Sequence, residues 1–291
     1  MSSLLSPELI RILSRLRLDA PPRTTGSYKG ESRSSSRGAS VEFQDYREYE
    51  PGDDYRHIDW SIYNRLDRLF VKMFAEERNR GLLLLLDASA SMQLGSPSKA
   101  DYARRLAAAL GYVALWRGDE VRQAEVTTRL SWRTPWLRGR QRLRPFLGQL
   151  EETATRGLTA LADALRTLPP RQGQGRVIVL ISDLLDPSWE AALTALSRSR
   201  GTPVLLHLLA PEDWAPLDRG AFELVDAETG ERLAVTLDDE AVRVYMETVQ
   251  RWMQEVRERC SKLGIACYQL DTSYSLEELL LADLREGGLL R

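Results

Sequence analysis

The sequence predicts an α/β fold, with a doubly wound, mostly parallel sheet and an N-terminal extension. The first observation is that the short runs Leu82–Leu86, Val177–Ser182 and Val204–Leu209 are almost continuously apolar, as in strands covered on both faces. The second is that helical patterns separate these runs, and strands that alternate with helices pair in parallel through right-handed crossovers. In such a sheet, a ligand binds beyond the carboxyl ends of the strands, where the strand order reverses.

Residues 1–80 are expected to form the N-terminal extension, and residues 81–291 the α/β domain. The extension begins with an amphipathic helix over Pro7–Leu18, for which Ser6 is a suitable N-cap. The segment Thr24–Ser40 is rich in Ser, Gly and Arg, which is typical of a loop. Its arginines could contact an acidic partner, and a solvated loop is the alternative.

From Gly81 onward, the local patterns predict each element in turn. Apolar residues at helical spacing predict helices over Lys99–Trp116, Gln141–Glu152, Ala160–Leu168, Trp189–Arg198, Asp239–Leu263 and Leu276–Leu284. Further strands are expected over Val121–Thr127, Leu130–Trp136, Phe222–Val225, Arg232–Val235 and Ile265–Leu270. The turn residues Glu228-Thr229-Gly230 predict a hairpin between the third and fourth of these strands.

The composition excludes several classes of protein. The chain has 291 residues, of which 40 are basic and 42 acidic, so its net charge of −2 argues against nucleic acid as the main ligand. It has two histidines and two cysteines, which excludes a disulfide-stapled scaffold and a four-ligand zinc cluster of these residues. No signal sequence and no apolar run long enough to span a bilayer is visible, so we expect a cytoplasmic protein without a membrane span.

Polar side chains follow two of the predicted strands and precede one helix. Asp87, Ser89 and Ser91 alternate directly after the first strand, so they can point the same way in an extended loop. Thr159 stands before the helix Ala160–Leu168, and Asp183 ends another strand. Two carboxylates and three hydroxyls form an all-oxygen set suited to Mg²⁺, with Mn²⁺ or Ca²⁺ as alternatives.

The same residues could have purely structural roles. An Asp at a strand end is often a turn residue. Ser89 and Ser91 could cap the following helix, and Thr159 is a good N-cap. A metal-free scaffold therefore stays open as an alternative.

The order and spacing of these five residues resemble the metal-ion-dependent adhesion site of von Willebrand factor type A domains. That pattern, Asp-x-Ser-x-Ser followed by a Thr and then an Asp, matches Asp87, Ser89, Ser91, Thr159 and Asp183 without a substitution. The resemblance implies a binding module in which an acidic residue of a protein partner takes the open position on the metal.

A second motif resembles the signature of the domain-of-unknown-function-58 family. Its parts are Arg47-Glu48-Tyr49-Glu50-Pro51-Gly52-Asp53-Asp54, Ile58-Asp59-Trp60 and Glu76-Glu77-Arg78. Members are similar to type A domains and are commonly linked to AAA+ ATPases of the MoxR type. The resemblance thus implies a class of partner.

The segment Arg47–Trp60 has three possible roles. The first is structural, as a turn at Pro51-Gly52 with a network of ion pairs that packs the N-terminal region on the core. The second is partner contact. The third is catalysis, with His57 as general base, but no nucleophile or substrate pocket is implied beside it.

A basic cluster also has two interpretations. Five arginines and no acid occur between positions 133 and 144, with tryptophans among them. We expect Arg133, Arg138 and Arg140 to contact an acidic protein partner. The alternative is a solvated surface on which the arginine stems cover apolar groups.

Together, these observations predict a non-catalytic, metal-dependent protein-interaction module, an adaptor for a MoxR-type ATPase or its clients. A Mg²⁺-dependent phosphoryl-transfer hydrolase using Asp87 is an alternative, although such a site would want an acid where Ser89 stands. The chain has no Gly-x-x-x-x-Gly-Lys-Ser/Thr loop, which argues against ATP hydrolysis.

Overall fold

The computed structural model describes residues 4–19, 42–50, 55, 58–75, 81–155, 157–215 and 219–291. They belong to two compact units, one made of Met1–Ser27 and Arg80–Arg291, the other of Tyr28–Asn79. The expected loop Thr24–Ser40 lies outside the described residues. The first residues of the predicted extension belong to the larger unit, where Leu9 and Leu13 are fully buried.

The larger unit is built on a sheet of seven strands with the order β11-β8-β7-β3-β4-β5, in which β6 also pairs with β4. The strands are β3 (Gly81–Asp87), β4 (Glu120–Val126), β5 (Leu130–Trp132), β6 (Leu137–Arg138), β7 (Val177–Ser182), β8 (Thr202–Leu209) and β11 (Ala266–Asp271). The first five strands in this order pair in parallel, whereas β5 and β6 run antiparallel to β4. The predicted doubly wound, mostly parallel sheet is confirmed.

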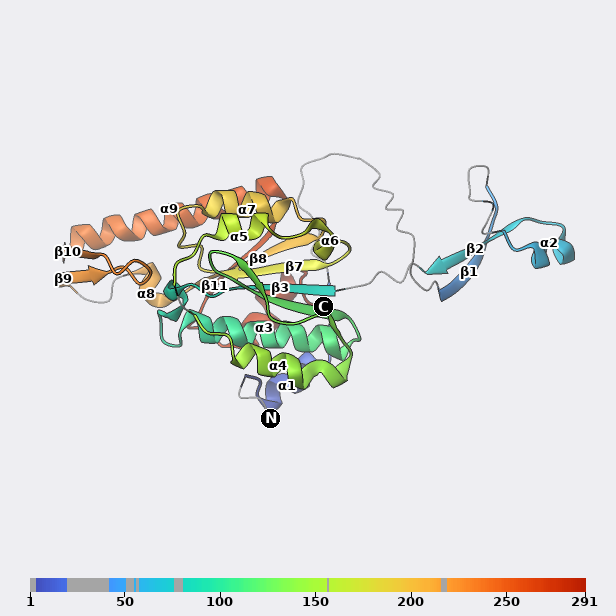
Figure 1. The fold of residues 1–291 in the computed structure, drawn as a ribbon, viewed down its shortest axis with the longest axis horizontal. Helices are drawn as coiled ribbons and strands as arrows, with labels where there is room; N and C mark the ends of the chain where they lie inside the picture. Colours follow the sequence, from blue (N-terminus) through green and yellow to red (C-terminus); the bar gives the residue numbers. More distant parts are fainter. Residues whose placement is uncertain are drawn as a thin grey trace. The chain divides into compact units, whose positions relative to one another are not determined.

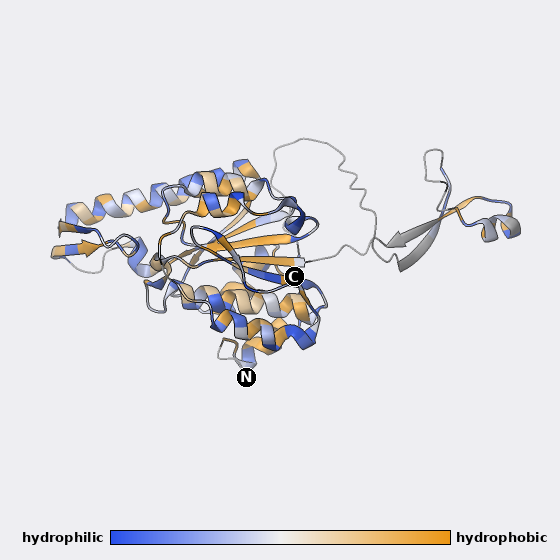
Figure 2. Ribbon diagram, in the orientation of Figure 1, coloured by the Kyte–Doolittle hydropathy of each residue, from blue (hydrophilic) through white to orange (hydrophobic). Residues whose placement is uncertain are grey.

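Helices cover both faces of this sheet (Figure 1). One face carries α1 (Pro7–Leu13), α3 (Lys99–Trp116), α4 (Leu143–Glu151), α10 (Leu276–Leu281) and α11 (Asp283–Glu286), and the other carries α5 (Leu161–Arg166), α7 (Trp189–Ser197) and α9 (Asp239–Leu263). Two short helices are α6 (Pro170–Gly173) and α8 (Pro211–Trp214). Strand β3 shows why both faces need cover, because Leu82, Leu84 and Leu86 enter one apolar core while Leu83 and Leu85 enter the other. The central strands are accordingly apolar throughout (Figure 2).

Most predicted elements occur within two residues of their expected bounds, and three differ by more. The predicted helix Leu276–Leu284 ends at Leu281, and the separate helix α11 follows it. The predicted strand Leu130–Trp136 ends at Trp132, because Pro135 has no N–H for a ladder. The predicted helix over Pro7–Leu18 ends at Leu13, and its last residues instead pair with the C-terminus, where Leu18 forms a bridge with Leu290.

A hairpin projects from the larger unit at the side of α9. Its strands β9 (Gly220–Val225) and β10 (Arg232–Leu237) pair antiparallel, as predicted. Both strands are almost entirely exposed.

The smaller unit contains the antiparallel strands β1 (Glu42–Glu48) and β2 (Phe70–Ala75) and the helix α2 (Trp60–Leu66). Asp59 caps this helix, since its Oδ1 accepts the N–H groups of Ser61 at 2.8 Å and Ile62 at 3.3 Å. Its Oδ2 accepts the hydroxyl of Tyr46 at 3.0 Å. This part of the signature motif therefore has a structural role.

Candidate functional site

The predicted carboxylates meet where the strand order reverses. The chain passes from β3 to β4 on one side and from β7 to β8 on the other, so the reversal lies between the adjacent strands β3 and β7. Asp87 is the last residue of β3, and Asp183 directly follows β7. Both are buried, with exposures of 3% and 1%. The fold thus brings them to the position where α/β sheets bind ligands.

The carboxylate of Asp87 is held by two neighbours. Its Oδ1 accepts the N–H of Ser89 at 2.9 Å, and its Oδ2 accepts the hydroxyl of Ser182 at 2.5 Å. Burial, and secondly the charge of Asp183, raise the pKa of Asp87 to about 7, although these hydrogen bonds act in the opposite direction. A positive charge close to Asp87 would therefore stabilise its ionised form.

Ser89 and Ser91 converge as predicted. Their Oγ atoms lie 3.0 Å apart in a hydrogen bond, and both residues are buried. Neither caps the following helix: α3 is capped by Ser98, and the short 3₁₀ turn Ala90–Gln93 begins at Ser89 without a side-chain hydrogen bond. Their hydroxyls thus remain directed at each other beside Asp87.

Thr159 lies on a loop that is attached to the same edge. The N–H of Ala90 donates to the carbonyl of Gly157 at 3.2 Å, which places this loop against the turn after β3. Thr159 is not the N-cap of α5, because Ala160 holds that position and Asp186 accepts the N–H of Leu161 at 2.7 Å. The Oγ1 of Thr159 is buried and has no hydrogen-bond partner. A buried hydroxyl without a partner is one that a bound group would satisfy.

Asp183 has a cationic neighbour that the sequence analysis did not include. The Nζ of the fully buried Lys99 lies 2.8 Å from its Oδ2 and 2.9 Å from the Oδ2 of Asp213 in α8. Burial opposes the charged form of Lys99, but the two carboxylates hold its pKa above the usual value. The other Asp183 oxygen accepts the N–H of Leu185 at 3.1 Å. Asp183 is therefore both a turn residue and half of a buried ion pair.

These residues fit a divalent cation held by mixed oxygens. Within the described ranges, no three Asp, Glu, His or Cys side chains form a group able to hold a metal ion. A cation would thus depend on hydroxyls as well as carboxylates, which is the donor set of Mg²⁺ rather than zinc. The unpartnered hydroxyl of Thr159 is the observation that favours this fit.

Two neighbours of the site could not have been identified as such from the sequence. Ser182 lies beside Asp183 in the chain, yet only the pairing of β3 with β7 places its hydroxyl on Asp87. Lys99 is 84 residues from its partner Asp183, and its burial at the start of α3 has no local signal. Asp87, Ser89, Ser91, Thr159 and Asp183 were named as candidates from local patterns, whereas Ser182 and Lys99 were not.

The three arginines expected to contact a partner make contacts within the chain. Arg133 pairs with Glu125 at 3.2 Å, and Arg138 donates to the carbonyl of Gly118 at 3.1 Å. Arg140 donates to the carbonyl of Trp116 at 3.0 Å and lies 3.7 Å above its ring. Two of these arginines therefore satisfy carbonyls at the end of α3, where a cation is favourable.

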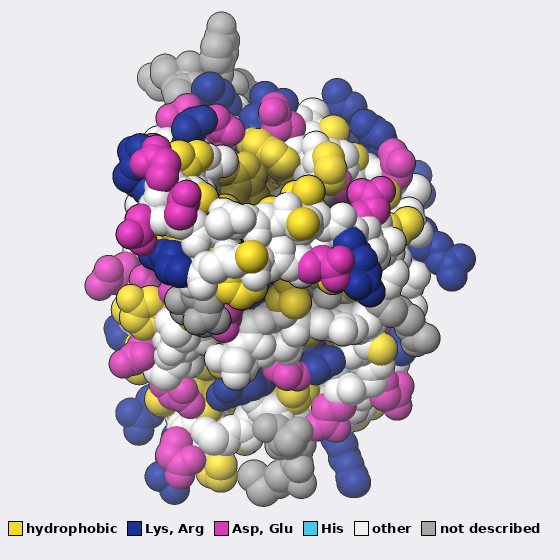
Figure 3. All heavy atoms as spheres, turned by 90° about the vertical axis from the view of Figure 1, so that its left-hand side faces the viewer, with side chains coloured by type: hydrophobic (Ala, Val, Ile, Leu, Met, Phe, Trp, Pro, Cys, Tyr) yellow, Lys and Arg dark blue, Asp and Glu magenta, His cyan; other side chains and the backbone are white. Residues whose placement is uncertain are grey.

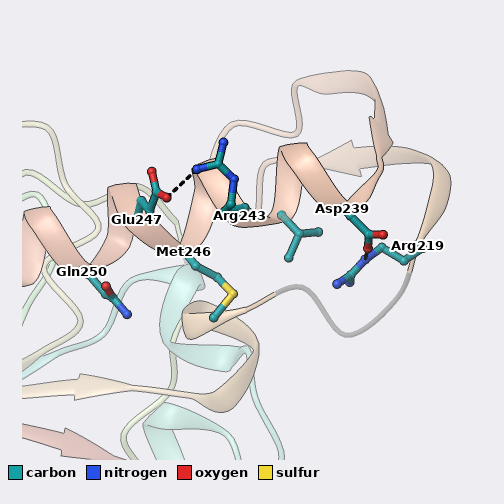
Figure 4. A pocket seen from close by; sticks show the side chains of 7 residues that line it. Arg219, Asp239, Arg243, Met246, Glu247 and Gln250 are labelled. Atoms are coloured by element: carbon teal, nitrogen blue, oxygen red, sulfur yellow. Dashed lines mark hydrogen bonds and ion pairs between the residues drawn. The ribbon is translucent and has the colours of Figure 1, made fainter.

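His57, the Pro51-Gly52 turn and Glu76-Glu77-Arg78 lie outside the described part of the chain, which does not include residues 51–54, 56–57 and 76–80. A surface hollow lies along α9, lined by Val242, Met246 and Gln250 with the ion pairs Arg219–Asp239 and Arg243–Glu247 (Figure 4). None of the predicted ligands lines it.

Solved structures resemble this chain at low sequence identity. One, described as an aerotolerance-related membrane protein from Bacteroides fragilis, is 19% identical, with 71% of this chain and 98% of that chain covered and a TM-score of 0.39. Another, a von Willebrand factor type A protein from Catenulispora acidiphila, is 14% identical, with 75% and 43% covered and a TM-score of 0.39.

The prediction of a cytoplasmic protein is wrong by this comparison, because a matching structure is described as a membrane protein. The absence of a visible targeting or spanning segment was too weak a basis for it. Among the helices of the described residues, none is both long and apolar enough to cross a membrane.

The sequence comparisons identify the family. The uncharacterized protein Mb1516 of Mycobacterium bovis is 30% identical over 233 residues, which cover 77% of this chain and 72% of that protein. Residues 45–256 match the family model described as protein of unknown function DUF58. The chain therefore belongs to the DUF58 family, as its signature motif predicted.

Proposed function

We propose that the larger unit is a non-catalytic protein-interaction module that depends on a divalent cation. Asp87, Ser89, Ser91, Thr159 and Asp183 would hold Mg²⁺, or Mn²⁺ or Ca²⁺ in its place. The observation that carries the proposal is the pair of buried carboxylates at the strand-order reversal, beside hydroxyls of which one, on Thr159, has no partner. A bound cation would neutralise Asp87 and offer an open position to an acidic residue of a partner.

An exposed apolar surface supports a protein as the partner. Phe222 pairs with Val235 and Leu224 pairs with Leu233 across the hairpin, so all four lie on one face. Phe222, Leu224 and Leu233 are 36%, 48% and 62% exposed. Hydrophobic side chains surround a hollow on this side of the molecule (Figure 3). Contiguous exposed apolar surface is typical of protein-binding sites. From the family resemblance, we further propose a MoxR-type AAA+ ATPase or its client as this partner.

The contacts of His207 support a binding role over a catalytic one. Its Nε2 lies 3.0 Å from the carbonyl of Asp183, and its ring packs edge-on against Trp252. Burial, above all, lowers the pKa of His207 to about 4, so it stays neutral near pH 7. A fully buried, neutral imidazole of this kind is a structural neighbour of the site.

The cation can be tested by thermal unfolding. Protein stripped with a chelator is melted with and without Mg²⁺, because a ligand that binds only the folded state raises its stability by about 2.7 kcal/mol at a hundred times its Kd. Asp87→Asn should abolish the increase, whereas Asp163→Asn, which changes an exposed acid of α5, should preserve it. An unchanged melting curve of the wild type with Mg²⁺, Mn²⁺ and Ca²⁺ would leave the metal-free scaffold as the better account.

The partner can be tested with the same variants. The wild type and Asp163→Asn should retain a MoxR-type ATPase from the same organism in a binding assay with Mg²⁺, and Asp87→Asn should not. If all three proteins retain the ATPase equally, the interaction does not depend on the cation site.

A further inference from the structure

The tip of the β9–β10 hairpin holds one side chain that differs from its neighbours. From residue 220 to residue 234, every residue is exposed except Glu228. Its carboxylate turns inward while the hairpin on either side faces solvent. An acidic side chain does not turn away from water without a favourable contact.

The contact is with the candidate site. The Oε2 of Glu228 accepts the N–H of Thr159 at 2.9 Å, and the two residues are 69 positions apart in the chain. The Oε1 of Glu228 is buried and has no hydrogen-bond partner, like the Oγ1 of Thr159. Both unpartnered oxygens would be satisfied by one shared group that accepts them as ligands.

The charges around Glu228 indicate the sign of that group. The acidic side chains of Asp183, Asp226 and Asp186 all lie close enough for their charges to act on the Glu228 carboxylate. The carboxylate thus lies in a field of acids with a single hydrogen bond. A cation is the group that would make this place favourable.

Hydrogen bonds within the turn define the local conformation of the segment that carries Glu228. The Oδ1 of Asp226 accepts the N–H groups of Glu228 at 2.9 Å and Thr229 at 2.7 Å. The carbonyl of Asp226 accepts the N–H of Gly230 at 2.9 Å, and Gly230 has a φ of +74°, which favours glycine.

We propose that Glu228 becomes a further ligand of the candidate cation site when a cation binds, and that the hairpin tip then closes over the site. This inference rests on the proposed cation site and adds a way in which access of a partner to that site is regulated. A partner that brings its own carboxylate must displace Glu228, and the exposed apolar face of the hairpin is then the surface that moves with it. The hairpin is therefore a cover that the chain itself supplies.

The test separates charge from the hydrogen bond. Glu228→Gln keeps an oxygen that can accept the N–H of Thr159 and removes only the charge. Glu231→Gln makes the same change at an exposed position of the same turn and serves as the matched control. Mg²⁺ binding to the full-length proteins is measured by calorimetry after chelator treatment, with Asp87→Asn as a third variant.

We expect Glu228→Gln to weaken Mg²⁺ binding by at least about tenfold, within the 10–100-fold range of lost metal-site contacts, and Glu231→Gln to leave it unchanged. Unchanged affinity in Glu228→Gln, together with lost binding in Asp87→Asn, would overturn this inference and leave the cation site intact. Absence of Mg²⁺ binding in the wild type would overturn both.

A second measurement follows the hairpin directly. Mg²⁺ should slow amide hydrogen exchange over residues 226–231 in the wild type and in Glu231→Gln, because the bound cation holds the tip closed. In Glu228→Gln this protection should disappear. Equal protection in the Glu228 variant would contradict the closure.

Discussion

Replacing Asp87 by Asn should stabilise the cation-free protein at neutral pH. The side chain is 3% exposed and lies in the field of Asp183, so its ionised form is unfavourable in the folded state. Asn has nearly the same shape and carries no charge. It can still accept the N–H of Ser89, and its amide can donate to Ser182.

The magnitude follows from the pKa. Folding raises it from 3.8 to about 7, which is about three pKa units and about 4 kcal/mol of cost to the ionised form. The variant also replaces the short hydrogen bond from Ser182 by a weaker one, which reduces the gain in stability by about 1 kcal/mol. We therefore expect a gain of about 3 kcal/mol in the free energy of unfolding above pH 7.

The difference in stability between the wild type and the variant should depend on pH in a defined direction. Because the folded pKa of Asp87 lies above the unfolded one, the folded state binds the extra proton between about pH 4 and pH 7, and the stability of the wild type relative to the variant falls as the pH rises through this range. His207, whose folded pKa is lowered to about 4, acts oppositely: its contribution to stability is lost as the pH falls from about 6.5 to about 4. It is present in both proteins and cancels in the difference.

The assay is urea unfolding of both chelator-treated proteins at steps between pH 4 and pH 8. The difference should be small at pH 4 and reach its full value near pH 8. Saturating Mg²⁺ should stabilise only the wild type and so reduce the difference in the free energy of unfolding between the two proteins. A difference that does not change with pH would refute the view that the buried charge of Asp87 governs this site.

Other predictions concern its neighbours and the core. Lys99→Met should lower the free energy of unfolding in urea by about 3–5 kcal/mol, because it leaves Asp183 buried beside Asp213 without a cation. Adding Asp183→Asn should recover part of that loss. If the effects of the two substitutions on the free energy of unfolding are strictly additive, the ion pair is contradicted. Thr159→Val should leave the melting temperature unchanged without metal, since its hydroxyl has no partner, but should lower Mg²⁺ affinity in calorimetry; equal affinity would remove Thr159 from the site. Gly111→Ala should cost about 1–3 kcal/mol, because a Cβ there would meet the ring of Phe146; a smaller loss would show that α3 and α4 can shift apart.

Local patterns were sufficient for most of the fold. The helix over Lys99–Trp116 and the long helix over Asp239–Leu263 have the predicted bounds, because Ser98 and Asp238 cap them and their apolar residues recur at helical spacing. The strand Val177–Ser182 also has the predicted bounds, since it is apolar throughout and needs cover on both faces. The strands β1 and β2 were not predicted, because two short strands with mixed polar residues lack a clear alternation.

Some local signals were compatible with more than one role. The structure removes the N-cap alternative for Thr159, whereas the partner contact of the arginines stays a prediction. Thr159 precedes a helix and has the side chain of a good N-cap, yet Asp186, from the loop after β7, accepts the helix N–H instead. The arginines from Arg133 to Arg140 have the composition of a binding surface, but two of them satisfy carbonyls at the end of α3. In each case the contact is made with a residue at least 20 positions away in the chain.

The sequence by itself determined the fold class, the family and the residues Asp87, Ser89 and Ser91 of the candidate site, because strand periodicity, caps and an alternating motif are properties of neighbouring residues. Only the tertiary structure decided which groups surround them. Lys99 reaches Asp183 and Glu228 reaches Thr159 from 84 and 69 positions away, through the packing of α3 and of the hairpin tip against one edge of the sheet. Contacts of that kind depend on where whole elements pack, and no local pattern of residues records them.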